Sequence, residues 1–317
     1  MTSYIAKRML AMIPMFIGVT ALLFVSINLA PGGPEMIFVA ETMQLDMAEQ
    51  IRHSLGLDRP FHIRYFLWLG ALVRGDMGRS LTGGGIPVAT LIWERTGATL
   101  LLTGISLVLS VVGALLFGTV SAFRQYSWID KLLTIIAYMG MSFPVFWLGI
   151  MLILLFAITL DWFPVAGMTT YGKEADILSR LSHLVLPVLT MTLVAVGRLT
   201  RFVRSSMLEV LTEDYLRTAR AKGIAERVVL FKHALRNGLI PIVTVVGLNL
   251  RTLLAGAVLT ETIFAWPGLG RLALMSVNRR DYPVVMGVNV AVTLLVLLAN
   301  LATDIAYSIV DPRIRYE

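Results

Sequence analysis

The 317-residue chain contains no cysteine, which excludes disulfide bonds, thiolate metal sites and cysteine nucleophiles. Charged residues are also scarce, since Asp, Glu, Lys and Arg together make up 15% of the chain, whereas soluble proteins carry about 25%. Apolar types reach 57%, and the mean hydropathy is +0.78. This composition excludes an ordinary soluble domain and predicts a protein that spans a lipid bilayer.

The chain also lacks the common sequence signatures of catalysis. Its four histidines are dispersed, and no two of them have the spacing of metal ligands. The sequence contains no H-E-x-x-H, no G-x-S-x-G and no Walker motif G-x-x-x-x-G-K-[ST]. We therefore expect a protein that is not an enzyme, with no catalytic residue, metal site or cofactor in this chain.

Six long apolar segments predict an all-α, polytopic integral membrane protein, because about 20 apolar residues in a helix cross a bilayer. The predicted spans are residues 9–30, 97–123, 132–160, 181–203, 239–260 and 283–308. Pro144 lies inside the third span, where it removes a helix hydrogen bond and should bend or break the helix. The first segment also resembles a secretory signal peptide, but its apolar core exceeds the usual length of about 7–15 residues. A retained span is therefore expected.

Two larger polar segments separate these spans, at residues 35–95 and 205–237. Within the first, apolar residues at helical spacing predict helices near residues 45–55 and 61–73. Nine basic residues lie between Arg198 and Arg236, which concentrates much of the +7 net charge in one place. This concentration favours a topology signal or a protein partner over nucleic acid.

The distribution of basic residues predicts the orientation in the membrane. Fifteen of the 27 basic residues flank the spans on one side: the nine above with Lys7, Arg8, Arg124, Lys131, Arg313 and Arg315. By the positive-inside rule that side is the cytoplasm. Both termini and residues 205–237 are therefore predicted cytoplasmic, and residues 35–95 extracytoplasmic.

The segment of residues 205–237 has a helical pattern as well as charge. One helical stripe is predicted at Met207, Val210, Leu211, Tyr215, Thr218, Ala219 and Lys222. Gly223 then follows a lysine, as a C-terminal cap does, and a second helical run covers residues 225–236. A topology signal alone explains the basic residues but not the ordered stripe. The pattern favours a helix–glycine–helix segment that docks into a groove of another protein.

Several motifs, in order along nearly the whole chain, resemble the permease subunits of binding-protein-dependent ABC importers of the dipeptide/oligopeptide type. They are GLDRPFHIRYFLWL (56–69), RGDMGRS (74–80), SFPVFWLG (142–149), DYLRTARAKG (214–223), HALRNGLIP (233–241), ETIFAWPGLGRL (261–272), RDYPVV (280–285) and DPRI (311–314). Of the general importer-loop consensus, only Ala219, Gly223 and Leu235 match. The departures resemble the peptide-type variant, in which RTARAKG is usual.

The resemblance implies the six-helix, type I permease fold, with a sizeable extracytoplasmic segment after the first helix, in a bacterial or archaeal cytoplasmic membrane. It also implies four kinds of partner: the lipid bilayer, a second homologous permease, two ATPase subunits or a fused equivalent, and an extracytoplasmic substrate-binding protein. ATP and Mg would be bound by the ATPases.

The resemblance also implies roles for particular residues. The residues implied to couple the permease to an ATPase are Glu213, Asp214, Tyr215, Arg217, Thr218, Ala219, Arg220, Ala221, Lys222 and Gly223. The residues implied to form an external gate or to contact the binding protein are Glu261, Trp266, Pro267 and Arg271.

The substrate path is harder to locate. Asn249 and Arg251 lie inside an apolar span, where charge is costly unless it faces a polar cavity or a partner. Arg251 could meet a peptide carboxylate in the path, or form a structural salt bridge to the partner permease. Nickel- or glutathione-type import remains open within the same family. A secondary carrier or channel is the alternative from another class, although no convincing inverted repeat is present.

Overall fold

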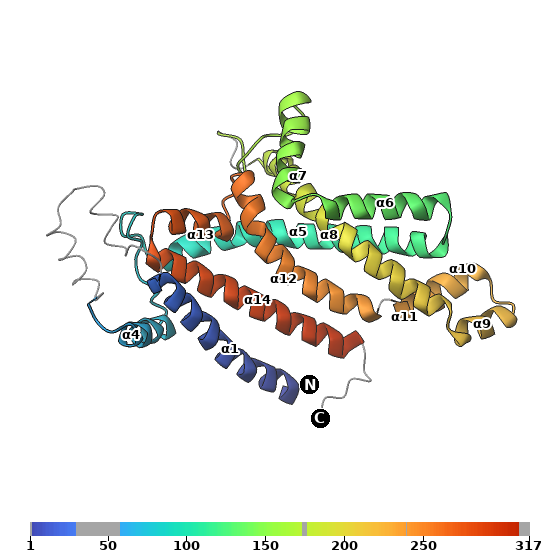
Figure 1. Ribbon diagram of the computed structural model, residues 1–317, viewed down its shortest axis with the longest axis horizontal. Coiled ribbons are helices and arrows are strands. Elements are labelled where there is room, and N and C mark those ends of the chain that lie inside the picture. The colour runs from blue at the N-terminus through green and yellow to red at the C-terminus, as the bar shows by residue number, and fades with distance from the viewer. Residues whose placement is uncertain (1, 30–57, 173–175, 239, 311–317) are drawn as a thin grey trace. The chain divides into compact units, whose positions relative to one another are not determined.

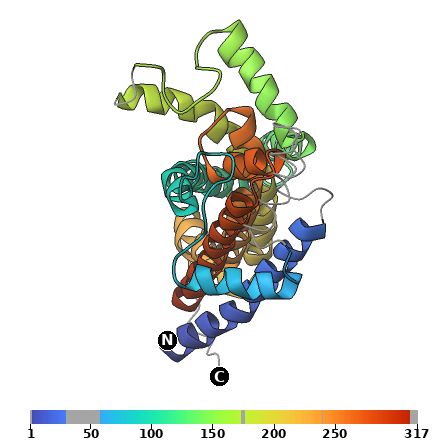
Figure 2. The same cartoon turned by 90° about the vertical axis from the view of Figure 1, so that its left-hand side faces the viewer.

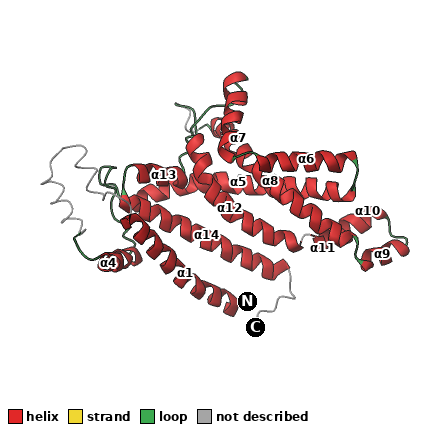
Figure 3. Ribbon diagram, in the orientation of Figure 1, coloured by secondary structure: helices red, strands yellow, loops and turns green. Residues whose placement is uncertain are grey.

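The computed structural model describes residues 2–29, 58–172, 176–238 and 240–310 (Figure 1). Within these ranges there is no strand (Figure 3). The structure has one isolated antiparallel bridge there, between Arg79 and Pro87. The all-α fold class predicted from the sequence is therefore confirmed. The helix predicted near residues 45–55 lies outside the described residues.

The α-helices are α1 (Thr2–Leu29), α4 (Phe61–Val73), α5 (Val88–Phe123), α6 (Trp128–Ser142), α7 (Val145–Leu152), α8 (Ile177–Leu211), α9 (Asp214–Ala221), α10 (Glu226–Val228), α11 (Leu235–Gly238), α12 (Ile240–Ile263), α13 (Leu269–Asn278) and α14 (Tyr282–Val310). Two π-helical segments, η1 (Ile153–Thr159) and η2 (Val229–Ala234), continue α7 and α10. They form two compact units, Met1–Thr99 with Pro267–Leu297, and Leu100–Trp266 with Leu298–Glu317. Helices α5 and α14 contribute to both.

In the first unit, the helix predicted over residues 61–73 is α4, and it packs against α1 (Figure 2). The hydroxyl of Tyr65 is 3.0 Å from the hydroxyl of Thr20, and both side chains are buried. The ring of Phe24 meets the ring of Tyr65 edge-on, with 5.5 Å between their centroids. Because apolar packing surrounds this polar contact, α4 is fixed to α1 at one register.

In the second unit, α6 and α8 approach each other closely. A Cβ built on Gly140 of α6 would lie 2.6 Å from the backbone oxygen of Leu193 on α8. A Cβ built on Gly197 of α8 would meet the backbone oxygen of Ala137 on α6. Any side chain at either glycine would push the two backbones apart. The glycines therefore allow the two helices to pack backbone against backbone.

The predicted break at Pro144 is confirmed. Helix α6 ends at Ser142, α7 begins at Val145, and the two are bent by 103°. Phe143 adopts an extended conformation (φ −88°, ψ 134°), as expected for a residue before proline. Further along, a Cβ on Gly149 of α7 would lie 3.3 Å from the ring of Phe264, beyond the end of α12. The second half of the broken segment thus packs at the end of α12.

Among the described residues, four helices are long and apolar enough to cross a membrane: Ala6–Leu29, Val88–Phe123, Ile177–Leu211 and Tyr282–Ile305. The bent pair of α6 with α7 and η1 makes five if it is one span. Helix α12 has 24 residues and covers most of the predicted span 239–260. The count of six spans stays a prediction, as does the side of the membrane on which residues 35–95 lie.

Helix α8 continues well past the predicted span of residues 181–203. It has 35 residues, which at about 1.5 Å per residue exceeds the thickness of about 30 Å of a bilayer's hydrocarbon core. Asp176 begins it as the N-cap, with its carboxylate accepting a hydrogen bond of 3.0 Å from the Leu178 N–H. The extension carries the helix into the segment of residues 205–237.

Candidate functional site

The segment of residues 205–237, which we call the coupling loop after its predicted role, begins as the last turns of α8. Helix α8 ends at Leu211, Thr212 and Glu213 form a turn, and α9 starts at Asp214. The prediction of one helical stripe from Met207 to Lys222 was therefore wrong, because a turn divides it. Residues at helical spacing occur on both sides of this turn, but of the predicted stripe residues in and after α9 only Ala219 is buried.

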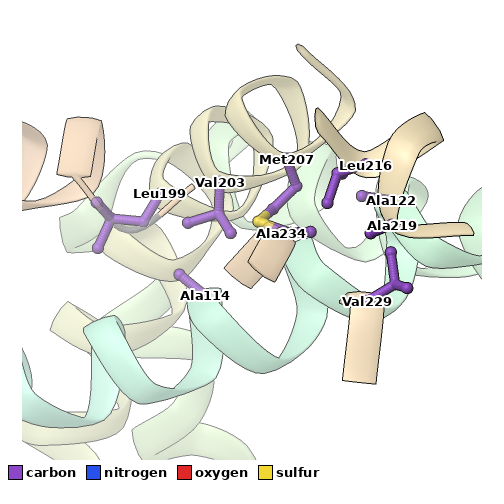
Figure 4. Packing of buried hydrophobic residues seen from close by; sticks show 9 residues of the cluster. All are labelled: Ala114, Ala122, Leu199, Val203, Met207, Leu216, Ala219, Val229 and Ala234. Carbon is purple, nitrogen blue, oxygen red and sulfur yellow. The ribbon is translucent and has the colours of Figure 1, made fainter. Parts of the chain in front are cut away.

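This buried cluster fixes the coupling loop to the end of the helix bundle (Figure 4). Its members are Ala114, Ala122, Leu199, Val203, Met207, Leu216, Ala219, Val229 and Ala234. Met207 from α8, Leu216 from α9 and Val229 from η2 are each 0% exposed. At about 25 cal/mol per Å² of apolar surface removed from water, these side chains are the main source of stability for the loop.

Helix α9 has one buried face and one exposed face. Leu216 and Ala219, three residues apart, are its two buried side chains. Of the ten predicted coupling residues, only Ala219 is buried; the exposed ones are Glu213, Asp214, Tyr215, Arg217, Thr218, Arg220, Ala221, Lys222 and Gly223. Arg217 and Asp214 form an exposed ion pair of 3.3 Å one turn apart. The exposed face is therefore polar and accessible to a partner.

The predicted C-terminal cap at Gly223 is confirmed. Gly223 has φ +74°, and the Ile224 N–H donates a hydrogen bond of 3.3 Å to the Ala219 carbonyl. Glycine is favoured there because a left-handed backbone strains residues that carry a Cβ. Across this turn Arg220 contacts Glu226 at 3.0 Å, and this hydrogen bond raises the pKa of Arg220. The second helical run then follows as α10, η2 and α11.

The sequence did not predict an ion pair that lies beside the loop. Asp130, in the first turn of α6, accepts two hydrogen bonds of 2.8 Å from the guanidinium of Arg204 on α8. The Asp130 side chain is 6% exposed and that of Arg204 is 27% exposed. The sequence pattern had placed both residues among the charges that flank the spans. Their separation of 74 positions left no local signal of the pairing.

The two residues proposed for the substrate path lie on α12. Asn249 is buried, at 7% exposure. The backbone of Arg251 belongs to the same helix, but its side chain lies outside the described residues. The role of both residues in the path stays a prediction.

The four residues proposed for the external gate differ in exposure. Glu261 and Trp266 are each 0% exposed, and the Trp266 N–H donates a hydrogen bond of 2.8 Å to the Glu261 carbonyl. Pro267 and Arg271 are partly exposed, and Arg271 lies in the first turn of α13. In this structure only the latter two have surface to offer another protein. The assignment of all four to a gate stays a prediction.

Comparison with known proteins places this architecture in a family. The family model described as "Binding-protein-dependent transport system inner membrane component" matches residues 114–316. A companion model for the N-terminal part of such membrane components matches residues 1–93. Together the two models cover nearly the whole chain, including all of the coupling loop.

Full-length relatives and solved structures agree with this placement. The chain is 43% identical over 316 residues to the oligopeptide transport system permease protein AppB of Bacillus subtilis, covering 100% of each chain. It is 37% identical over 339 residues to the dipeptide transport system permease protein DppB of Escherichia coli K12, again over 100% of each.

A structure of the inward-facing methionine ABC transporter MetNI aligns with 70% of this chain and 96% of its own, at 19% identity and a TM-score of 0.58. Similarity at that level of identity concerns the fold alone, which is that of an ABC transporter permease. The fold, the two family models and the full-length relatives lead to one conclusion: this chain belongs to the family of binding-protein-dependent transport system inner membrane components.

Proposed function

We propose that this chain is the permease subunit of an ABC importer that takes up dipeptides or oligopeptides. The observation that supports this most directly is its end-to-end similarity to permeases named for oligopeptide and dipeptide transport. In this proposal the chain forms the path across the cytoplasmic membrane together with a second, homologous permease. A substrate-binding protein delivers the peptide from outside.

The energy for transport comes from two separate ATPase subunits, or a fused equivalent, which bind ATP and Mg. In this proposal ATP and any cofactor are held by those subunits and not by this chain. The exposed face of α9, with Tyr215, Arg217 and Thr218, seats on an ATPase. Its buried face, with Leu216 and Ala219, fixes α9 to α8. For ATP binding to switch the permease, the two states of the ATPase must contact α9 differently, since only a differential interaction shifts an equilibrium.

The proposed topology follows from the coupling role. The coupling loop faces the cytoplasm, where the ATPases are, and both termini lie on that side. Residues 35–95 and the region of Pro267 and Arg271 face outward, where the binding protein docks. The nine basic residues between Arg198 and Arg236 then satisfy the positive-inside rule.

Reconstitution of the complete transporter in proteoliposomes tests this function. Labelled dipeptides and oligopeptides should accumulate only when the binding protein is outside and ATP is available to the ATPases. Glutathione and a nickel complex serve as competing cargo. Accumulation of either in preference to peptides would assign the chain to the corresponding importer type, and ATP-independent flux through the permease alone would favour a carrier or channel.

A further inference from the structure

A buried polar cluster connects three helices at the point where α8 enters the coupling loop. Its centre is the carboxylate of Asp130, which contacts both the Nε and a terminal nitrogen of Arg204 at 2.8 Å. The hydroxyl of Ser121, on α5, donates to the same carboxylate and accepts a bond of 3.1 Å from the Arg204 Nε. The cluster therefore joins α5, α6 and α8.

The carboxylate has further donors from its own surroundings. The backbone N–H of Tyr126, in the turn between α5 and α6, donates to Asp130 at 3.0 Å, and the Thr134 hydroxyl at 3.4 Å. Tyr126 has φ +63°, a left-handed conformation that strains a residue with a Cβ. The Asp130 contact holds the turn in this conformation. The network fixes the geometry of the turn as well as the ion pair.

Stability alone is a weak explanation for such a pair. Removing two charges from water offsets much of their attraction, so a buried ion pair is often no more stabilising than apolar residues of the same volume. Its best-supported role is to specify one register between the elements that it joins. Here those elements are α6 and the cytoplasmic end of α8.

Three further contacts hold the same two helices together along α8. Gly197 approaches Ala137, Gly140 approaches Leu193, and the guanidinium of Arg201 lies over the ring of Tyr138 at 5.4 Å from its centroid. The Arg204 contact comes after these along the chain. One turn later Met207 enters the buried cluster beneath α9. Of these four contacts between α6 and α8, the ion pair therefore lies nearest the coupling loop along α8.

We propose that Arg204 and Asp130 are positioning residues for energy coupling, and that they lock α6 to α8 so that both helices move as one body. This inference rests on the proposed function, in which α9 meets an ATPase. A displacement of α9 moves α8 through the cluster around Met207. The lock passes the displacement to α6, and α6 carries it to the 103° bend before α7. Without the ion pair, only the contacts farther from the coupling loop still join α6 to α8, and less of the displacement reaches the bend.

Neutral substitutions in the reconstituted transporter test the lock. Arg204→Gln and Asp130→Asn should retain ATP hydrolysis but reduce peptide transported per ATP by about two- to thirty-fold, the range for mutations that modulate coupling between sites. Arg204→Lys keeps a charge that can still reach Asp130, and should restore part of the ratio lost in Arg204→Gln. A role in stability alone would instead lower the amount of folded complex and leave the ratio unchanged.

Lys131→Gln is the matched control for Arg204→Gln. Lys131 follows Asp130 in the chain, its side chain is exposed, and the substitution removes the same unit of charge. The control should keep the wild-type ratio of transport to hydrolysis. Equal ratios in Arg204→Gln, Asp130→Asn and wild type would overturn the proposal.

A cross-link tests the same idea without disturbing the ion pair. Because the chain has no cysteine, Tyr138→Cys with Arg201→Cys introduces the only two thiols in this subunit. If α6 and α8 move as one body, joining the pair with a flexible bifunctional reagent should leave ATP-driven transport intact. Transport that is lost on cross-linking and recovered on cleavage of the link would show relative movement of the two helices, and would contradict the lock.

These outcomes are distinct from a failure of the proposed function. If the wild-type complex accumulates no peptide, the proposed substrate class is wrong, but the cross-link can still be scored with whichever cargo is transported. If the wild type accumulates peptide and the variants keep its coupling ratio, only the lock is wrong.

Discussion

The hydroxyl of Ser80 donates a hydrogen bond of 2.5 Å to the carboxylate of Asp281, a residue 201 positions later in the chain. The same carboxylate oxygen accepts from the backbone N–H of Thr82 at 3.1 Å and from its hydroxyl at 2.9 Å. Asp281 is 1% exposed and immediately precedes α14. These bonds tie the turn after α4 to the start of α14.

Replacing Asp281 by alanine should release this turn. The Ser80 and Thr82 donors would lose their acceptor. A hydrogen bond to a charged group contributes about 1.5–3 kcal/mol to stability. We expect a lower unfolding temperature of the purified subunit and faster proteolysis near Ser80. Asp76→Ala, which alters an exposed carboxylate bonded to the Gly78 N–H, is the control. Equal unfolding temperatures for both variants would contradict this role of Asp281.

The Asp281 tie should also depend on pH. Burial raises the pKa of the Asp281 carboxyl, but the hydrogen bonds from Ser80 and Thr82 outweigh this effect, and its pKa lies below the ordinary value of 3.8. A lowered folded-state pKa means that the carboxylate contributes stability above pH 3.8, and that this stability is lost as pH falls further. The difference in unfolding temperature between wild type and Asp281→Asn should therefore be largest near neutral pH and shrink below pH 3.8. A constant difference across this range would refute the explanation.

The two faces of α9 should respond differently to mutation. Leu216 is 0% exposed and Tyr215 is 40% exposed. Truncating a buried leucine costs about 2–5 kcal/mol, so Leu216→Ala should destabilise the isolated subunit and loosen the loop. Tyr215→Ala should leave the unfolding temperature nearly unchanged but weaken ATPase binding in a co-purification assay. If Tyr215→Ala destabilises the subunit as much as Leu216→Ala does, this assignment of faces is wrong.

Gly223→Val should leave the protein in the membrane but uncouple transport. No atom lies within 4 Å of a Cβ built on Gly223, so the change acts through its φ of +74° alone. Gly172 has φ +78° and equally open surroundings, which makes Gly172→Val a control for backbone strain outside the coupling loop. Gly223→Asn, which tolerates this backbone better, should recover part of the activity. Normal ATP-driven uptake by Gly223→Val would exclude this cap from coupling.

Arg251 provides a test of the substrate path. If it meets the carboxylate of a peptide, Arg251→Ala should reduce uptake of peptides by about ten-fold or more, as expected for a lost bond between charged groups. Peptides with an amidated C-terminus should be less affected, and Arg251→Lys should retain part of the uptake. Unchanged uptake across the whole panel would remove Arg251 from the path.

Local backbone chemistry made several features of this fold predictable. Proline at 144 cannot continue a helix, and the structure bends there. Glycine after a lysine at 223 suits a left-handed cap, and the backbone has that conformation. The helical spacing of apolar residues over Phe61–Val73 was enough to place α4. In each case the deciding interaction lies within one or two helical turns.

Features that depend on distant partners were not predictable. The turn at Thr212 and Glu213 was missed because residues at helical spacing occur on both sides of it, as in an unbroken helix. Leu216 was left out of the predicted stripe because an unbroken helix would place it on the opposite side from Met207, and only the turn brings both into one cluster. The pair of Asp130 and Arg204 depends on the packing of α6 against α8, which no single segment encodes.

The central claim is that the exposed face of α9 meets an ATPase. A photo-reactive amino acid at Thr218, on that face, should cross-link to the ATPase subunit in the assembled transporter, with a yield that changes between ATP-bound and nucleotide-free states. The same group at Leu216, on the buried face, should link only within this chain. Adducts from Thr218 that contain no ATPase in either nucleotide state would contradict the account.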